Sequence, residues 1–493
     1  MTKYKCFVAL SIIAVLVVVG CGEQTRKKEP VNKSVNAPLA ESVNAPSVEQ
    51  PSIDEIIKEV NASGTITDEQ AESLNEVEIL ILNGLTSISN EQAENLILEG
   101  LSLSIYGVRA LSLNGLTSIT DAQAECLGKV KALKLSGLTS ITNEQAESLV
   151  STPQYDDALE LNGLASITDA QAKSLGKTYQ LWLNGLTSLN DEQAKGLANL
   201  TETLQLNGLT SLTDVQVEIL SNYRARRVLS LDGLTSITDK QAESLSKVSA
   251  ITLNGLASLT DEQAARLSKD GRLGGVELGG LTSLTDAQAE SLSKIQSLVL
   301  NGLTSITDEQ AESLARVKGY LGLNGLTSIS DEQAESLTCN EYVHLTGLTS
   351  ITDAQAESLS KLEYIELNGL TSITDEQVER LAKAEGYLEL NGLITISDEQ
   401  AASLSKVESL YLNGLTTITD EQVEKLAKAE GYLELNGLTT ISDEQAASLS
   451  KVESLYLNGL TTITDAQAES LSKGGYLVVP EDLQPLIDKF RNE

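Results

Sequence analysis

Histidine, tryptophan and methionine each occur once in this chain, and aromatic residues make up only 3% of it. That is too little aromatic content for an ordinary large globular enzyme. His344, the single histidine, has no second histidine with which to bind zinc and no cysteine near it in sequence. The glycines form no phosphate loop or dinucleotide fingerprint, and no acidic segment has the Asp-x-Asp spacing of a calcium loop. We therefore expect no enzyme activity, no catalytic residue, no cofactor and no metal site.

Cysteine and basic residues are also scarce. Four cysteines do not make a disulfide scaffold, and many repeats separate Cys126 from Cys339, so we expect both to be unpaired, small packing residues. Lysine and arginine total 35 against 70 acidic residues, a net charge of −35. Nucleic acid is therefore not expected as a partner, because phosphate binding needs basic side chains. The acidic residues recur mostly in DEQAES segments, which we interpret as a solubilising face. A face for cations or basic proteins is the alternative.

A long hydrophobic run occurs only near the start, over residues 6–19, where it follows Lys3 and Lys5. The run is too short for a comfortable membrane span and is typical of the apolar part of an export signal. It ends in Val-Val-Gly-Cys, at Cys21, which resembles the lipobox of bacterial lipoproteins. The resemblance implies that residues 1–20 are a signal peptide, that cleavage occurs before Cys21 and that Cys21 is acylated. A plain signal peptide is the alternative.

Residues 21–52 have the composition of a disordered tether, with four of the seven prolines and two copies of SVNAP. No aspartate follows Cys21 directly, which by analogy with lipoprotein sorting permits transfer to the outer membrane. Several acyl chains would anchor the protein stably. We therefore expect a protein of the bacterial cell envelope, lipid-anchored at the outer membrane or cell surface, that meets the membrane through its lipid only.

From about Asn61 onward the chain repeats itself. A typical copy is SLVLNGLTSITDEQAESLARV, residues 297–317. Leu298 and Leu300 are separated by one residue, which is the period-two pattern of a short half-buried strand. Thr307 and Gln310 then have the spacing of a capping box, and the residues that follow predict a helix with a buried stripe. One copy is therefore a strand, a loop and a helix.

A glycine after each strand marks seventeen copies: Gly84, Gly115, Gly137, Gly163, Gly185, Gly208, Gly233, Gly255, Gly280, Gly302, Gly325, Gly347, Gly369, Gly392, Gly414, Gly437 and Gly459. This glycine either turns the chain through positive φ or allows two backbones to approach closely. Stacked copies bury an apolar face that a single copy cannot bury, with parallel strands on one side and helices on the other. We therefore predict an α/β solenoid over residues 53–480.

The pattern resembles the leucine-rich-repeat family, because the strand leucines fit the L-x-x-L-x-L register. The segment LTSITDEQAESL is similar to the cysteine-containing subclass and to leucine-rich repeats of planctomycete-type bacterial proteins. The resemblance covers residues 61–479 and implies a horseshoe with parallel strands on the concave face and short helices on the convex face. Leu303 stands where the family has an Asn or Cys that hydrogen-bonds the backbone of the loop. We therefore expect Thr304 and Ser305 to hydrogen-bond the polar backbone groups of the loop instead.

Both ends of a solenoid need caps. At the N-terminal end, the half-copy formed by residues 65–74 is expected to start the solenoid directly with its helix. At the other end, residues 476–479 predict a final strand, and Pro480 cannot donate to a ladder. Residues 481–493 follow as the predicted C-terminal capping helix.

Tyrosine is concentrated in the later copies. It occupies two strand columns, four and two residues before the position that usually holds asparagine, and the first ten copies have none in either column. The first column contains Tyr320, Tyr342, Tyr364, Tyr387, Tyr432 and Tyr476, and the second contains Tyr411 and Tyr456 together with His344, Glu366, Glu389 and Glu434. Alternation with period two predicts that both columns face solvent.

Two classes of function fit this distribution. A localised patch in the C-terminal half favours a non-catalytic recognition scaffold that binds a protein, peptide or glycan; a structural or surface-coat element without a specific ligand is the alternative. The candidate ligand-binding residues are Tyr320, Tyr342, Tyr364, Tyr387, Tyr411, Tyr432, Tyr456, His344, Glu366, Glu389 and Glu434. Two facts keep sheet packing open as the origin of the tyrosines: tyrosine is a good strand former, and residues 383–427 are nearly repeated by residues 428–472.

Overall fold

The computed structural model describes residues 51–75, 77–97, 110–150, 157–222, 228–269, 273–340, 342–384, 386–429 and 431–491. The expected signal peptide, Cys21 and nearly all of the expected tether lie outside these residues. The chain divides into two compact units, residues 1–206 and residues 207–493. In the described ranges, no helix has both the length and the apolar character needed to cross a membrane.

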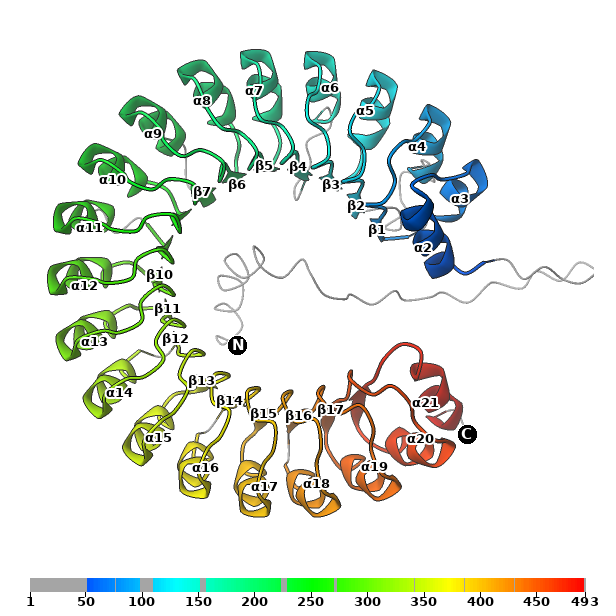
Figure 1. Cartoon of the computed structure of the whole chain (residues 1–493), viewed down its shortest axis with the longest axis vertical. Coiled ribbons are helices and arrows are strands. Elements are labelled where there is room, and N and C mark those ends of the chain that lie inside the picture. Colours follow the sequence, from blue (N-terminus) through cyan, green and yellow to red (C-terminus); the bar gives the residue numbers. More distant parts are fainter. Residues whose placement is uncertain are drawn as a thin grey trace, which may run out of the picture. The chain divides into compact units, whose positions relative to one another are not determined.

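In the first unit, short strands and short helices alternate along the chain (Figure 1). Its helices are α2 (Ile53–Ser63), α3 (Asp68–Ser73), α4 (Asn90–Leu96), α5 (Asp121–Leu127), α6 (Asn143–Ser148), α7 (Asp169–Leu175) and α8 (Asp191–Leu197). Its strands are β1 (Ile79–Ile81), β2 (Ala110–Ser112), β3 (Ala132–Lys134), β4 (Ala158–Glu160), β5 (Gln180–Trp182) and β6 (Thr203–Gln205), which pair in chain order and in parallel.

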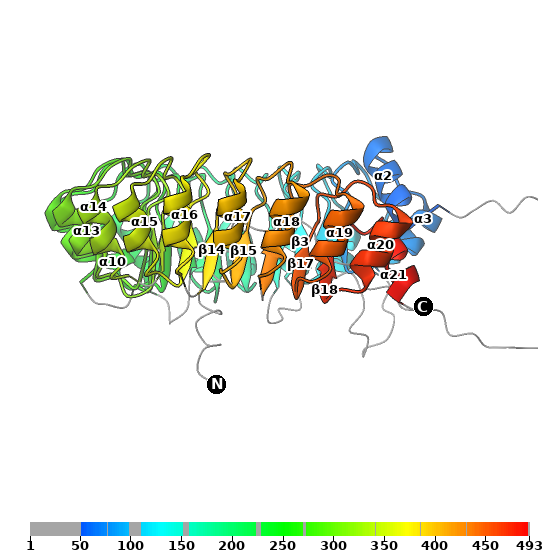
Figure 2. The same cartoon turned by 90° about the horizontal axis from the view of Figure 1, so that it is seen from below.

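The second unit repeats the same alternation. Its helices are α9 (Asp214–Ser221), α10 (Asp239–Leu245), α11 (Asp261–Leu267), α12 (Asp286–Leu292), α13 (Asp308–Leu314), α14 (Asp331–Leu337), α15 (Asp353–Leu359), α16 (Asp375–Leu381), α17 (Asp398–Leu404), α18 (Asp420–Leu426), α19 (Asp443–Leu449), α20 (Asp465–Ser472) and α21 (Gln484–Arg491). Its strands are β7 (Val228–Ser230), β8 (Ala250–Thr252), β9 (Gly275–Glu277), β10 (Ser297–Val299), β11 (Tyr320–Gly322), β12 (Tyr342–His344), β13 (Tyr364–Glu366), β14 (Tyr387–Glu389), β15 (Ser409–Tyr411), β16 (Tyr432–Glu434), β17 (Ser454–Tyr456) and β18 (Tyr476–Val478). Neighbouring helices from α15 to α20 lie side by side in Figure 2.

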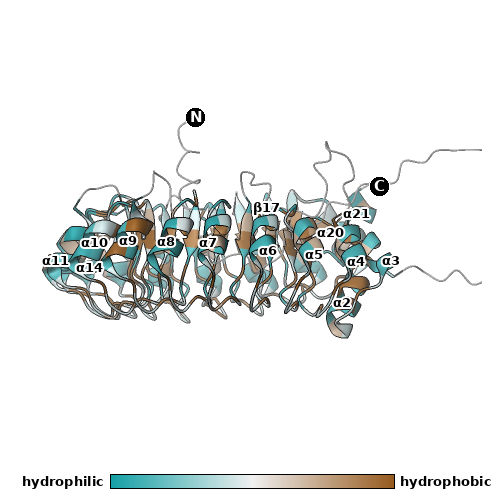
Figure 3. Ribbon diagram, turned by 90° about the horizontal axis from the view of Figure 1, so that it is seen from above, coloured by the Kyte–Doolittle hydropathy of each residue, from teal (hydrophilic) through white to brown (hydrophobic). Residues whose placement is uncertain are grey.

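Each copy buries the same apolar residues between its strand and its helix. In the copy that begins with β10, Leu298, Leu300, Leu303, Ala311 and Leu314 are all fully buried. Burying one leucine side chain contributes about 1.5–3 kcal/mol, and the next copy along supplies the surface that covers it. The outer helix surfaces are mostly hydrophilic, teal in Figure 3, with the apolar α9 as a brown exception. The α/β solenoid predicted from the sequence is confirmed, with the strands of each unit on one side and its helices on the other.

The predicted capping box is present, and its glutamine also links neighbouring copies. The Gln310 N–H donates to Thr307 Oγ1 at 3.2 Å, and the Thr307 N–H donates to Gln310 Oε1 at 3.1 Å. The Gln310 amide then donates across the boundary to the carbonyl of Leu284 at 2.9 Å. Equivalent bonds tie most helices to the copy before them. The cap hydroxyls add a second link, as in the 2.6 Å bond from Thr352 to Asp331.

A third series of bonds follows the asparagine that precedes the repeat glycine. Asn301 Oδ1 accepts the N–H of Asn324 at 3.0 Å, and Asn324 Oδ1 accepts that of Thr346 at 3.2 Å. The same bond recurs in both units. The expectation for Thr304 is confirmed only at the equivalent position of some other copies, where the threonine hydroxyl donates to a carbonyl of the preceding copy, as Thr349 Oγ1 does to Thr327 at 3.3 Å. The recurring ladder is carried by the residue before the glycine, while Leu303 packs in the core.

Strand pairing in the second unit is interrupted at one boundary. Strands β7–β12 pair in order and strands β13–β18 pair in order, but no ladder joins β12 to β13. At this boundary Thr346 replaces the ladder asparagine, and its side chain makes no bond to the N–H of Asn368. Side chains bridge the boundary instead: His344 Nδ1 lies 2.8 Å from Glu366 Oε2.

The repeat glycine allows close approach of two backbones. A Cβ on Gly414 would lie 2.1 Å from the carbonyl oxygen of Asn391 and 2.6 Å from that of Leu393, both in the preceding copy. Of the described glycines, Gly64 alone has positive φ, at 74°, and it ends a helix rather than following a strand. Of the two roles left open by the sequence, close approach is therefore the correct one.

The N-terminal cap is a helix that the sequence interpretation missed. Helix α2 starts with a capping box formed by Ser52 and Glu55 and buries Ile56 and Val60. Asn61, near its end, begins the asparagine series by accepting the Gly84 N–H at 2.7 Å. The expectation that the solenoid starts directly with the half-copy was wrong, because α2 covers that end first.

The C-terminal cap is a strand followed by a helix, as predicted from the sequence. Strand β18 is followed by α21, which begins slightly later than expected and packs on α20. Ile487 of α21 is fully buried, and Lys489 Nζ lies 3.0 Å from Asp465 Oδ2 of α20. The cap therefore combines an apolar contact with an ion pair.

The two later cysteines are both free, as expected, but they differ in environment. Cys126 in α5 is half-buried, and burial raises the pKa of its thiol. Cys339 is exposed, so the expectation that it is a packing residue was wrong.

Candidate binding face

The strand side of the second unit carries the predicted aromatic residues. Within this unit the strands line the inner side of a curve and the helices its outer side (Figure 1), and we call the strand side the inner face. The central residue of each strand points into the core, so the residues on either side of it reach the inner face. The tyrosine stripe consists of Tyr320, Tyr342, Tyr364, Tyr387, Tyr411, Tyr432, Tyr456 and Tyr476, one on each strand from β11 to β18.

The tyrosine rings form a continuous series of contacts from Tyr342 to Tyr476. Successive ring centroids are 5.7, 6.1, 4.4, 4.7, 4.6 and 5.8 Å apart, which is the range of favourable aromatic pairs. The series changes column at Tyr411 and again at Tyr456, where the paired strand positions are Ser409 and Ser454. The two columns distinguished in the sequence therefore form a single run of rings.

Tyr320 does not stack on its neighbour in the same column. Its ring centroid lies 4.4 Å from that of His344, in the other column of β12. Gly322 makes room for this arrangement, because a Cβ there would lie 3.1 Å from the Tyr320 ring. His344 is thus held between Tyr320 and the carboxylate of Glu366 and is only 16% exposed.

Two carboxylates of the face are surrounded by neutral donors. Tyr387 Oη donates to Glu389 Oε2 at 2.5 Å, and the amides of Asn368 and Asn391 donate to Oε1. Glu434 repeats this arrangement with the Tyr432 hydroxyl, at 2.7 Å, and the amides of two neighbouring asparagines. These glutamates are held in fixed positions without a basic partner.

Three stripe tyrosines, Tyr320, Tyr387 and Tyr432, have a raised pKa and stay protonated well above neutral pH. Burial raises the pKa of Tyr387 and Tyr432, and their hydrogen bonds to Glu389 and Glu434 raise it further. Burial and the nearby carboxylates of Glu366 and Glu277 raise the pKa of Tyr320 to about 12. At neutral pH these three tyrosines therefore present neutral hydroxyls.

The structure corrects the expectation that both columns face solvent throughout. The stripe tyrosines from Tyr320 to Tyr456 are half-buried, and Tyr476 is exposed. In some tyrosine-free strands the second column is covered: Ser230 and Thr252 are buried and their hydroxyls share a 2.5 Å hydrogen bond, whereas Ile81 of β1 is exposed. Small residues in this column are packed between neighbouring copies, which the alternation pattern alone does not reveal.

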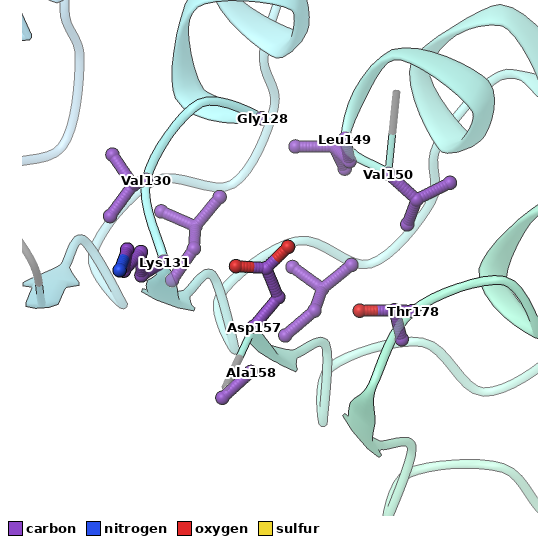
Figure 4. A pocket seen from close by; sticks show the side chains of 10 residues that line it. Gly128, Val130, Lys131, Leu149, Val150, Asp157, Ala158 and Thr178 are labelled. Atoms are coloured by element: carbon purple, nitrogen blue, oxygen red, sulfur yellow. The ribbon is translucent and has the colours of Figure 1, made fainter. Parts of the chain in front are cut away.

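Hollows elsewhere on the molecule offer no better site. A cavity of about 10 Å³ in the first unit, between Lys131 and Asp157 (Figure 4), has room for no more than one water molecule. A groove of about 520 Å³ lies over α18 and α19 and is lined by charged helix residues such as Glu424 and Lys425. Within the described part of the chain, no three histidine, cysteine or acidic side chains gather as metal ligands.

No protein-family model and no curated protein sequence matches the chain. Among solved structures, the chain is similar to a chain in the crystal structure of the mouse RP105/MD-1 complex, with 14% sequence identity and a TM-score of 0.46 over 84% of this chain and 85% of that one. At this identity and TM-score the similarity says nothing about what this chain binds. Its own repeat geometry, parallel three-residue strands that alternate with short capped helices, identifies the fold as a leucine-rich-repeat-like α/β solenoid.

Proposed function

We propose that this chain is a non-catalytic recognition scaffold that binds a protein, peptide or glycan through the inner face of its C-terminal half. The observation that carries the proposal is the unbroken stripe of tyrosines on consecutive strands. Tyrosine combines a large rigid ring with a hydroxyl at low entropic cost, which is why it is common in binding surfaces. The contacting residues would be the stripe with His344, Glu366, Glu389 and Glu434.

The scaffold would be displayed at the bacterial cell envelope. The support is the sequence that ends at Cys21, which resembles a lipobox, and the proline-bearing segment after it. A lipid on Cys21 would hold the solenoid to the outer membrane or cell surface, and residues 21–52 would give it reach. Nucleic acid is not proposed as a partner, since the net charge is −35.

A structural element without a specific ligand is the second candidate. It is favoured because the tyrosines of the stripe already have partners within the chain. The hydroxyls of Tyr387 and Tyr432 donate to neighbouring glutamates, and the rings contact one another. On this view the tyrosines stabilise the sheet, and their number reflects duplication of residues 383–427.

The two candidates are separated by an array of peptides and glycans probed with the full-length protein. We expect at least one ligand whose affinity falls roughly thirty-fold, about 2 kcal/mol, on substitution of Tyr364→Ala or Tyr387→Ala. Trp182→Ala is the matched control, because Trp182 is a half-buried aromatic residue on a strand of the first unit. Equal affinities for all three variants, with melting curves that show intact folding, would leave the stripe as sheet packing.

A further inference from the structure

On the two sides of the second unit, acidic residues have different partners. On the helix side, lysine and arginine pair with the carboxylates: Arg380 lies 2.7 Å from Glu376, and Lys383 lies 2.8 Å from Glu357. Similar pairs occur from α9 to α21. Among the described residues of that side, nine carboxylates are therefore in ion pairs within the chain.

The inner face has carboxylates but no such compensation. The strand positions from β7 to β18 that reach this face include Glu277, Glu366, Glu389 and Glu434, and none of these positions holds lysine or arginine. Among these four glutamates, Glu366 alone has an ionisable basic partner, His344. The tyrosine stripe thus runs beside negative charge that the described residues of the chain leave unbalanced, and a partner of opposite charge would complement it.

The ring contacts also restrict what can bind. A neutral sugar stacks on an open ring face, but from Tyr342 to Tyr456 each ring contacts a neighbour at a centroid distance of 4.4–6.1 Å. The rings therefore offer mainly their edges and hydroxyls. Tyr476, at the end of the stripe, is the exposed exception at 56%. This arrangement favours a ligand held by charge and hydrogen bonds over one held by stacking.

We propose that the inner face of the second unit binds an extended cationic peptide whose lysine or arginine side chains pair with Glu366, Glu389 and Glu434. This inference rests on the proposed function and specifies its ligand. The spacing fits: neighbouring parallel strands lie about 4.8 Å apart, so Glu389 on β14 and Glu434 on β16 are separated by roughly 10 Å. A peptide in the extended polyproline II conformation has three residues per turn and rises about 3.1 Å per residue, so side chains three residues apart share one face and lie about 9 Å apart, close to this distance. Arginine would also donate hydrogen bonds to the tyrosine hydroxyls that this face offers.

The experiment measures binding of labelled dodecapeptides to the full-length protein by fluorescence anisotropy. The probes are four tandem copies of Arg-Ser-Ser, the same peptide with glutamate for arginine, and the same peptide with glutamine. A hexamer of β-1,4-linked N-acetylglucosamine is the glycan arm. We expect only the arginine peptide to bind, and more weakly as salt increases.

The matched variants change the same charge on opposite sides of the duplicated copies. Glu389→Gln with Glu434→Gln should weaken binding of the arginine peptide at least tenfold. Glu399→Gln with Glu444→Gln, on the outer helices α17 and α19, should change it less than twofold. If the inner-face pair lowers the melting temperature, the single variants Glu389→Gln and Glu434→Gln are compared instead, each with an expected loss of at least threefold.

Three other outcomes would each contradict the peptide proposal. Equal losses in the two double variants mean that the peptide responds to net charge alone and overturn the proposal. Binding of the glycan but not the arginine peptide also overturns it, yet leaves the proposed function standing if Tyr387→Ala abolishes that binding. Failure of the wild type to bind the arginine peptide overturns the peptide proposal, while the tyrosine variants on the wider array still decide the proposed function.

Discussion

At the scale of residues, the ionisation of Tyr320 is linked to folding. Its pKa in the folded protein is about 12, against about 10 for an unfolded tyrosine. Between these values the folded state holds the proton and the unfolded state releases it, so the stabilising contribution is complete below pH 10 and is lost as the pH rises towards 12. Urea unfolding from pH 9 to 12 should show a free energy of unfolding that falls less steeply for Tyr320→Phe than for the wild type. Identical slopes would contradict this assignment.

At the scale of residues, the sequence predicted which side chains share a face but not which of them touch. Alternation placed the tyrosines and glutamates on one side of the strands, as observed. The contact of Tyr320 with His344 was not predictable, since it depends on the open space above Gly322. The burial of Ser230 and Thr252 was also missed, because it is set by how closely neighbouring copies pack. Contacts between copies depend on how the stack of copies curves, and this curvature cannot be predicted from the sequence of one copy.

At the scale of elements, the boundary between β12 and β13 lacks one bond of the asparagine series. Replacing Thr346 with asparagine would supply an acceptor for the N–H of Asn368, as Asn324 does for Thr346. A hydrogen bond of this kind contributes about 1 kcal/mol, so Thr346→Asn should raise the free energy of unfolding by about that amount in urea titrations. The matched control is Asn324→Thr, which removes the bond to Thr346 and should lower it similarly. A neutral or destabilising Thr346→Asn would show that the boundary is set by something other than the missing amide.

The strands and helices of the repeat were predicted well because each copy restates the same signals. The alternating leucines define a strand, and the Thr-x-x-Gln box defines the start of a helix. Where one copy departs from this pattern, the neighbouring copies still show where its strand and helix lie. Helix α2 lies outside the repeat and was missed for that reason. Its signal was nonetheless present: Ser52 and Glu55 form a capping box, and Ile56 and Val60 share one helix face.

At the scale of the whole chain, the proposed envelope anchor depends on one residue, Cys21, whose thiol would carry lipid. Cys21→Ser should leave the protein unprocessed or soluble, because serine cannot form the thioether through which the resembled lipoproteins are anchored. Labelled palmitate incorporation and partition between membrane and aqueous fractions measure the effect. The comparison with Cys126→Ser, which should behave as the wild type does, controls for loss of any cysteine. A Cys21→Ser protein that still incorporates palmitate would rule out this anchor.

The three series of bonds between copies have a genetic consequence. The boundaries within residues 383–472 are joined by nearly the same amide contacts. Unequal recombination between residues 383 and 428 would therefore remove or insert one block and leave the same contacts at the new boundary. Each block carries two stripe tyrosines, Tyr387 and Tyr411, and one glutamate at an inner-face strand position, Glu389. The length of the inner face can therefore change by two strands at a time, about 10 Å, and related genes that differ in block number would encode receptors graded for ligands of different length.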